Sequence, residues 1–187
     1  MRLPALPALP STLVAVLAVW GAFSLALVAA HAGLLVHALA VGATPRVDFA
    51  STNDVRFVLN WSELGDHRIA EVVHSYRSKH PLLADHLEAY AIRVTEVHEY
   101  ELDGSMLAEW PRRRWSRGDR LDTLTADALD FAVPAHEIPW FPTATALKTE
   151  RYFVYRHAVE LHDGVDAAAL VFVRLSDRMV YYVSYRV

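Results

Sequence analysis

The fold is decided by the stretch at residues 150–187, which reads ERYFVYRHAVELHDGVDAAALVFVRLSDRMVYYVSYRV. Apolar side chains alternate with polar ones through much of it, as in strands with a buried face. Two short polar breaks, Asp163-Gly164 and Ser176-Asp177, are typical of hairpin turns. The sequence therefore predicts three antiparallel strands in a meander, at residues 150–162, 167–175 and 178–187.

Between residues 55 and 142 the sequence predicts further strands and helices. A period of two indicates strands at 55–61 and 90–102, whereas apolar residues at helical spacing indicate helices at 66–79, with Asp66 as its N-cap, and at 122–132. Pro81 is expected to open a short helix that runs to Glu88. Asp103-Gly104 predicts a hairpin turn into a strand at 106–110, and three prolines predict a loop at 134–142.

This element order predicts an α+β fold, in which a single domain has a curved antiparallel sheet with helices packed on one face. The order is similar to that of cone-shaped NTF2-like or cystatin-like domains, some of which are tethered outside the membrane by one N-terminal helix. The resemblance is one of topology, and no sequence motif accompanies it.

The amino-terminal segment carries no Asp, Glu, Lys or Arg between Arg2 and Arg46. Its 13–41 portion would form a helix about 43 Å long, which exceeds the roughly 30 Å hydrocarbon core of a bilayer. We therefore expect a Pro-rich leader at 1–12, a transmembrane anchor at 13–42, a linker at 43–54 and an α+β domain at 55–187. A cleaved signal sequence and a buried core helix are the alternatives.

The charges beside this segment predict its orientation. Arg2 and the amino group lie on one side, whereas Arg46 on the other side is offset by Asp48. The positive-inside rule then favours an amino terminus in the cytoplasm. Lysine is rare beside arginine, a bias typical of GC-rich bacterial genomes. We expect a single-pass protein of the bacterial cytoplasmic membrane with a periplasmic domain.

The composition excludes several classes of site. The chain has no cysteine, which excludes disulfides, thiol nucleophiles and thiolate metal ligands. Without Arg2 and Arg46, 16 of the 18 basic residues remain against 22 acidic ones, so the domain is mildly acidic and nucleic acid is not an expected partner. There is no Gly-rich phosphate loop, nucleophile elbow or calcium loop, and no cofactor is expected.

Three polar residues interrupt apolar strand faces and are candidates for acid–base chemistry. Glu96 and His98 lie on the same face of the strand predicted at 90–102, and His157 enters the apolar face of the next long strand. A buried carboxylate beside an imidazole would have a shifted pKa and could act as acid and base. The alternative is that the strand runs past the helical layer, so that its second half is exposed to solvent.

His67, Glu71 and His74 are candidate metal ligands, because the spacing i, i+4, i+7 would place them on one stripe of the helix predicted at 66–79. The His-Glu-x-x-His order of zinc proteases is absent. A solvated helix surface is the alternative interpretation.

An arginine-rich segment and an aromatic loop are candidate binding surfaces. Arginine and tryptophan together suit anionic headgroups, phosphates or a partner protein; the alternative is a solvated hairpin that packs only against local carboxylates. Aromatics between prolines can either cover a core edge or contact a partner. The candidates are Trp110, Arg112, Arg113, Arg114, Trp115, Arg117, Trp140 and Phe141.

The sequence thus favours a membrane-anchored, non-enzymatic accessory or assembly subunit that acts through protein–protein contacts at the membrane surface, with a membrane protein as partner. The alternative is a pocket protein that binds a small apolar ligand or performs acid–base chemistry with Glu96, His98 and His157.

Overall fold

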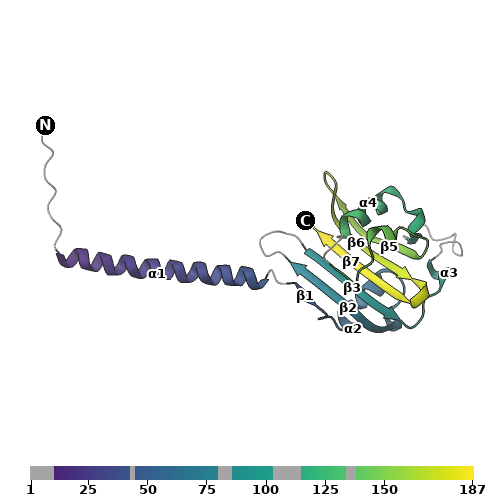
Figure 1. Ribbon diagram of the computed structural model, residues 1–187, viewed down its shortest axis with the longest axis horizontal. Helices are drawn as coiled ribbons and strands as arrows, with labels where there is room; N and C mark the ends of the chain where they lie inside the picture. The colour runs from purple at the N-terminus through teal and green to yellow at the C-terminus, as the bar shows by residue number, and fades with distance from the viewer. Residues whose placement is uncertain (1–10, 43–44, 80–85, 103–114, 134–137) are drawn as a thin grey trace. The chain divides into compact units, whose positions relative to one another are not determined.

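The structure is a computed structural model that describes residues 11–42, 45–79, 86–102, 115–133 and 138–187 (Figure 1). The chain divides into two compact units, Met1–Gly42 and Ala43–Val187. The turn predicted at Asp103-Gly104, the strand predicted at 106–110 and the start of the short helix predicted at Pro81 lie outside the described residues.

In the first unit a single element is described, the helix α1 (Ser11–Gly42). Alanine and leucine, two of the strongest helix formers, dominate its sequence. Every α1 side chain that the structure describes is exposed, including the large aromatics Trp20 and Phe23. Among the described residues, no helix combines the length and the apolar character needed to cross a membrane.

The described residues of the second unit form one seven-stranded sheet in the order β1-β2-β3-β7-β6-β5-β4. All neighbouring strands are antiparallel. The strands are β1 (Arg46–Val47), β2 (Ile69–Lys79), β3 (His86–Val94), β4 (Trp115–Arg117), β5 (Tyr152–Leu161), β6 (Val165–Arg174) and β7 (Met179–Arg186).

The carboxyl-terminal meander is confirmed, because β5 pairs with β6 and β6 with β7 in antiparallel register. A single turn of 3₁₀ helix (Leu175–Asp177) makes the second connection, and Arg178 follows it in the left-handed region at φ 56°. The helix predicted at 122–132 is also confirmed as α4 (Thr123–Ala132). Its N-cap Asp122 accepts a 2.7 Å hydrogen bond from the Thr125 backbone N–H.

The strand predicted at 55–61 is wrong, because this segment is the helix α2 (Thr52–Trp61). Its buried residues Val55, Val58 and Leu59 have the i, i+3, i+4 spacing of one helical face. Ser51 and Asp54 form a capping box that starts the helix. Val55, Phe57, Leu59 and Trp61 alternate along the chain, but Val58 between them is also buried, so the period of two does not hold.

The helix predicted at 66–79 is wrong as well, since Asp66–Arg68 is a 3₁₀ turn and β2 follows it. The register of β2 against β3 shifts twice, between Ile69 and Glu71 and between Val72 and His74. Each bulge adds a residue and moves the following side chains to the other face. A strand with two bulges therefore shows apolar spacings that mimic a helix.

The strand predicted at 90–102 is correct only to Val94, where β3 ends, and Glu99–Leu102 forms a short helix, α3. Residues 86–88, predicted to end a helix, begin β3 instead. The predicted order of elements is therefore wrong between residues 55 and 88, which removes the basis for the similarity to cone-shaped domains.

Helices cover both faces of the sheet, which corrects the prediction of a single covered face. On one side, here the α2 face, Val55, Val58 and Leu59 of α2 pack in one buried cluster with Tyr90 and Tyr182. On the opposite side, the α4 face, α4 and the short helix α5 (Ala144–Leu147) pack in a second cluster. The signal was present in the sequence, because 168–173 of β6 is a continuous apolar run, typical of strands buried on both faces.

Candidate functional site

The α2 face is covered over only part of its length. Where α2 lies, the sheet contributes a row of large side chains in cross-strand register, and α2 buries them. This inner row consists of Tyr90, Tyr182, Val171 and Tyr155, on β3, β7, β6 and β5.

The next two rows on this face carry small or polar residues instead, because side chains two positions apart share a face. The register follows the same four strands from β3 to β5. The middle row is Glu88, Ser184, Ala169 and Ala158, and the outer row is His86, Arg186, Ala167 and Glu160.

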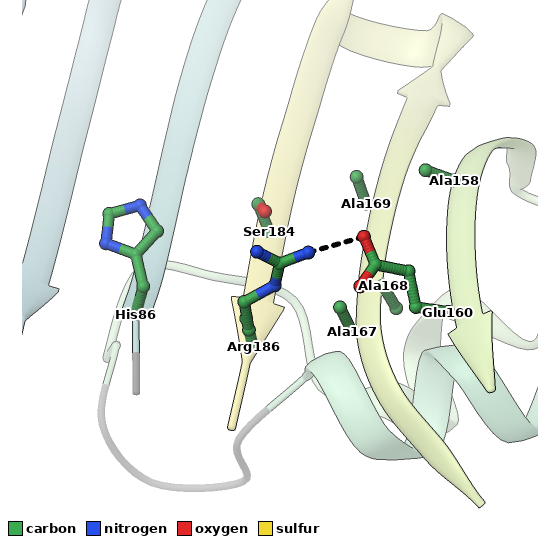
Figure 2. A pocket seen from close by; sticks show the side chains of 8 residues that line it. All are labelled: His86, Ala158, Glu160, Ala167, Ala168, Ala169, Ser184 and Arg186. Carbon is green, nitrogen blue, oxygen red and sulfur yellow. Dashed lines mark hydrogen bonds and ion pairs between the residues drawn. The ribbon is translucent and has the colours of Figure 1, made fainter. Parts of the chain in front are cut away.

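All residues of these two rows except Glu88 line a hollow of about 220 Å³. Figure 2 shows that Ala167 lies between the longer side chains of Arg186 and Glu160, and that Ala169 lies between Ser184 and Ala158. A methyl group is all that each alanine contributes, so the sheet surface is lower here than in the inner row. The hollow is thus produced by three alanines that occupy adjacent positions on β5 and β6.

Charged and polar side chains form the rim of the hollow. The Arg186 guanidinium donates to a carboxylate oxygen of Glu160 across β6, and each of the two side chains is 54 % exposed (Figure 2). His86 lies directly opposite Arg186 in the register of β3 and β7. Ser184 belongs to the middle row, where it lies opposite Glu88. The rim therefore offers a guanidinium, an imidazole and a hydroxyl above an apolar floor.

A partly buried polar cluster supports the rim on the side of β2 and β3. Glu88 accepts hydrogen bonds from Arg77 and from the Tyr90 hydroxyl, and its other oxygen lies 3.5 Å from His86 Nε2. Burial, followed by the neighbouring Glu88 carboxylate, raises the pKa of Tyr90. Burial also raises the pKa of Tyr182 to about 12. Both phenols are therefore neutral at physiological pH and are hydrogen-bond donors rather than bases.

His157 lies at the inner end of the hollow. The β5–β6 register shifts between Arg156 and Ala158, which places His157 in a bulge. Its ring stacks on Trp61 of α2, with centroids 4.1 Å apart and planes 2° apart. The predicted entry of His157 into an apolar face is thus explained by an aromatic contact with the end of α2.

Glu96 and His98 lie elsewhere, beyond the end of β3, and both side chains are exposed. The His98 ring stacks on Tyr100 at 5.2 Å, and its backbone N–H donates to Glu101 over 2.9 Å.

The sheet register separates these two residues from His157. Arg93, near the end of β3, shares a row with Tyr152 through β7 and β6, and His157 is five residues further along β5. At about 3.3 Å per residue and about 4.8 Å per strand, that is roughly 17 Å along the sheet and 14 Å across it. The geometry gives no support to a shared acid–base site.

The three predicted metal ligands do not form a stripe, because their helix is absent. His67 belongs to the 3₁₀ turn, whereas Glu71 and His74 belong to β2 and are separated by a bulge. Glu71 pairs with Arg93 over 2.8 Å, and His74 stacks on Trp140 at 5.2 Å. Within the described part of the chain, no group of three metal-ligating side chains occurs.

Of the arginine-rich segment only Trp115 and Arg117 can be placed, since Trp110, Arg112, Arg113 and Arg114 lie outside the described residues. The Trp115 indole N–H donates to the Ser62 carbonyl over 3.2 Å. Arg117 lies 3.7 Å from a Glu99 carboxylate oxygen and 3.8 Å from one of Glu150. Both side chains make contacts within their own domain.

Arg117 also lines an open depression of about 790 Å³. This depression lies at the Arg174 end of β6, whereas the hollow lies at its Ala167 end. Arg174 lines the depression too and is engaged by Asp177 and by the hydroxyls of Tyr152 and Tyr181, at 2.7 and 2.6 Å. The acidic and basic side chains that line the depression are equal in number, so it has no net charge.

In the aromatic loop, Trp140 and Phe141 have different environments. Phe141 is buried in the cluster on the α4 face and packs edge-on against Phe172 and Tyr181. Trp140 is half-buried over His74. Of the two interpretations of this loop, the packing of Phe141 agrees with cover for the core.

No family model, no curated protein and no solved structure matches this chain.

The residues of the hollow were missed by sequence reasoning. The signal that was available is the run at 167–169, where three consecutive alanines stand inside an otherwise large-residue strand. Alanine is depleted in strands, so such a run indicates a place where short side chains leave a depression in the sheet surface.

Proposed function

We propose that this protein is a single-pass, membrane-anchored accessory or assembly subunit that acts through protein–protein contacts rather than catalysis. The observation that carries the proposal is α1, a 32-residue helix without a charged residue whose side chains are apolar in the main. A helix that is apolar on all sides is stable only inside a core or in lipid.

The sequence adds the length argument. The uncharged run at 13–41 is 29 residues long, and about 20 are sufficient for a bilayer. With Arg2 on the cytoplasmic side, the α+β domain would lie outside a bacterial cytoplasmic membrane.

Membrane insertion is testable with two charges near the middle of α1. In a Leu25→Arg, Val28→Arg variant each arginine costs about 2.5–3.5 kcal/mol of insertion free energy. The wild-type protein should remain in the membrane pellet after alkaline carbonate extraction, whereas the variant should be released. A matched Arg56→Ala, Arg93→Ala variant of the folded domain should stay in the pellet.

Two outcomes would contradict an anchor. Wild-type protein in the carbonate supernatant would exclude insertion. A mature protein whose intact mass lacks the first forty or so residues would establish a cleaved signal sequence instead.

The accessory role is tested by affinity purification of the full-length protein from membranes in mild detergent. A variant with alanine at residues 112–114 should lose a stoichiometric membrane-protein partner, while alanine at Arg56, Arg93 and Arg178 should retain it. Recovery of the same partner with both variants would exclude the arginine-rich segment as the contact, and a lone monomer would contradict the accessory role.

The second candidate function, small-molecule binding, is favoured by the alanine-floored hollow. It does not involve Glu96 and His98, which lie outside that region of the sheet.

A further inference from the structure

The hollow combines two chemical environments within one small volume. Its floor is made of the methyl groups of Ala158, Ala167 and Ala169, and its rim holds the Arg186 guanidinium beside the His86 imidazole. A guanidinium presents parallel N–H donors that match the two oxygens of a carboxylate. Methyl groups give favourable contact to an apolar or aromatic surface.

The size of the hollow limits what it can hold. Its volume of about 220 Å³ lies below the roughly 300–1,000 Å³ of sites for drug-sized ligands. A compound of one ring, or a short branched chain, with one charged group matches that volume.

The geometry points to a binding site for a small organic carboxylate: its carboxylate contacts Arg186 and His86, and its apolar body rests on the three alanines. Ser184, on the same face between Glu88 and Ala169, is a further hydroxyl donor to the bound oxygen atoms. The site does not depend on the anchor or the partner proposed above.

Glu160 forms an ion pair with the Arg186 guanidinium in the structure. Since both Arg186 and Glu160 are 54 % exposed, their ion pair contributes little to stability and can be exchanged for a ligand carboxylate. Glu160 is therefore a competitor for Arg186. Removal of Glu160 and removal of Arg186 have opposite effects on affinity, which a purely structural ion pair would not produce.

The test uses the full-length protein in neutral detergent with ¹³C-methyl-labelled alanine. Benzoate is the probe, and benzamide and benzylamine are its neutral and cationic counterparts. Benzoate should shift the methyl resonances of Ala158, Ala167 and Ala169 in a saturable manner, while the other two compounds should shift them little.

Four substitutions test the assigned contacts. Arg186→Gln should weaken benzoate binding by about tenfold or more, the loss of a charge-assisted pair. Glu160→Gln should tighten it by about twofold to fivefold. Ala158→Leu and Ala167→Leu, at positions that are not buried, should abolish it by filling the hollow.

A second exposed ion pair of the same sheet supplies the matched control. Arg93 and Glu71 join β3 to β2 and are 50 % and 54 % exposed. Arg93→Gln and Glu71→Gln change the net charge as the Arg186 and Glu160 variants do, and they should leave benzoate affinity unchanged.

Three results would overturn the assignment. Equal binding of benzoate and benzamide would exclude recognition of the carboxylate. Equal effects of Glu160→Gln and Glu71→Gln would reduce the result to net charge. Resonance shifts confined to alanines outside the hollow, or retained in Ala158→Leu, would place the binding elsewhere.

Discussion

The two ends of the α2 face use the same four strands in opposite ways. At one end Tyr90, Tyr182 and Val171 project from the sheet and are buried under Val58 and Leu59 of α2. At the other end the same strands present Glu88, Ser184 and Ala169, then His86, Arg186 and Ala167, and of these six residues only Ala169 belongs to the buried cluster under α2. The backbone pairing is continuous across both ends.

The difference shows that side-chain volume and the position of one helix across the strands, rather than the sheet itself, create the hollow. α2 ends at Trp61, where the Ser62 hydroxyl donates to the Val58 carbonyl over 2.8 Å. α2 crosses the strands: just before it begins, the Ala50 N–H donates to Ser75 of β2, and at its end Trp61 stacks on His157 of β5. The covered end should therefore carry the stability, and the open end should be free to bind.

The largest effect is expected at the covered end. Leu59→Ala removes a side chain that is 0 % exposed, so it should lower the free energy of unfolding by about 2–5 kcal/mol. Urea denaturation followed by circular dichroism measures it, with the exposed Arg56→Ala on the same helix as control. A loss below about 1 kcal/mol would mean that α2 is not the principal cover of this face.

An intermediate effect is expected from pH. Burial raises the pKa of Tyr182 from 10.0 to about 12, so below pH 10 its phenol is neutral in both the folded and the unfolded chain. Between pH 10 and 12 the unfolded chain loses a proton that the folded protein keeps, and stability therefore falls as pH rises.

The urea midpoint should decrease across this pH range, and less steeply in Tyr182→Phe than in the wild type. Tyr100→Phe, which removes a ring that is 56 % exposed, should follow the wild-type curve. Identical slopes for wild type and Tyr182→Phe would contradict the burial of this hydroxyl.

The smallest effect is expected at the open end. Arg186→Gln should change the free energy of unfolding by less than about 1 kcal/mol, because exposed ion pairs contribute little. The same urea titration measures it. A loss comparable with that of Leu59→Ala would show that the rim of the hollow supports the fold, and the contrast between the two ends would fail.

The meander and α4 could be predicted because their signals are local. Polar breaks at Asp163-Gly164 and Ser176-Asp177 separate three long apolar segments, and Asp122 stands at the N-cap of a helically spaced run. Neither inference requires knowledge of what packs against the segment.

The errors before residue 95 have one cause, which is that short apolar patterns depend on partners elsewhere in the chain. Val55, Val58 and Leu59 fit a helix once the sheet beneath them is known. Ile69 and Val72 pack toward α2, whereas Val73 and Tyr76 pack toward α4, because bulges in β2 change the face. A bulge is a property of strand pairing, so no single-strand period shows it.

The candidate site could not be predicted for a related reason. Its members come from β3, β5, β6 and β7 and are separated by up to 100 residues, from His86 to Arg186. Conversely, local patterns predicted an acid–base site at Glu96, His98 and His157, yet the register places His157 far from the other two.

The sequence by itself determined the uncharged apolar segment at 13–41, the absence of cysteine chemistry, the α4 helix and the three-stranded meander, because composition, caps and turns act within a few residues. The tertiary structure alone decided which face each strand of the amino-terminal half buries, and that three alanines, Arg186 and His86 meet at one place. Those features depend on cross-strand register, a long-range property that fixes which distant side chains become neighbours.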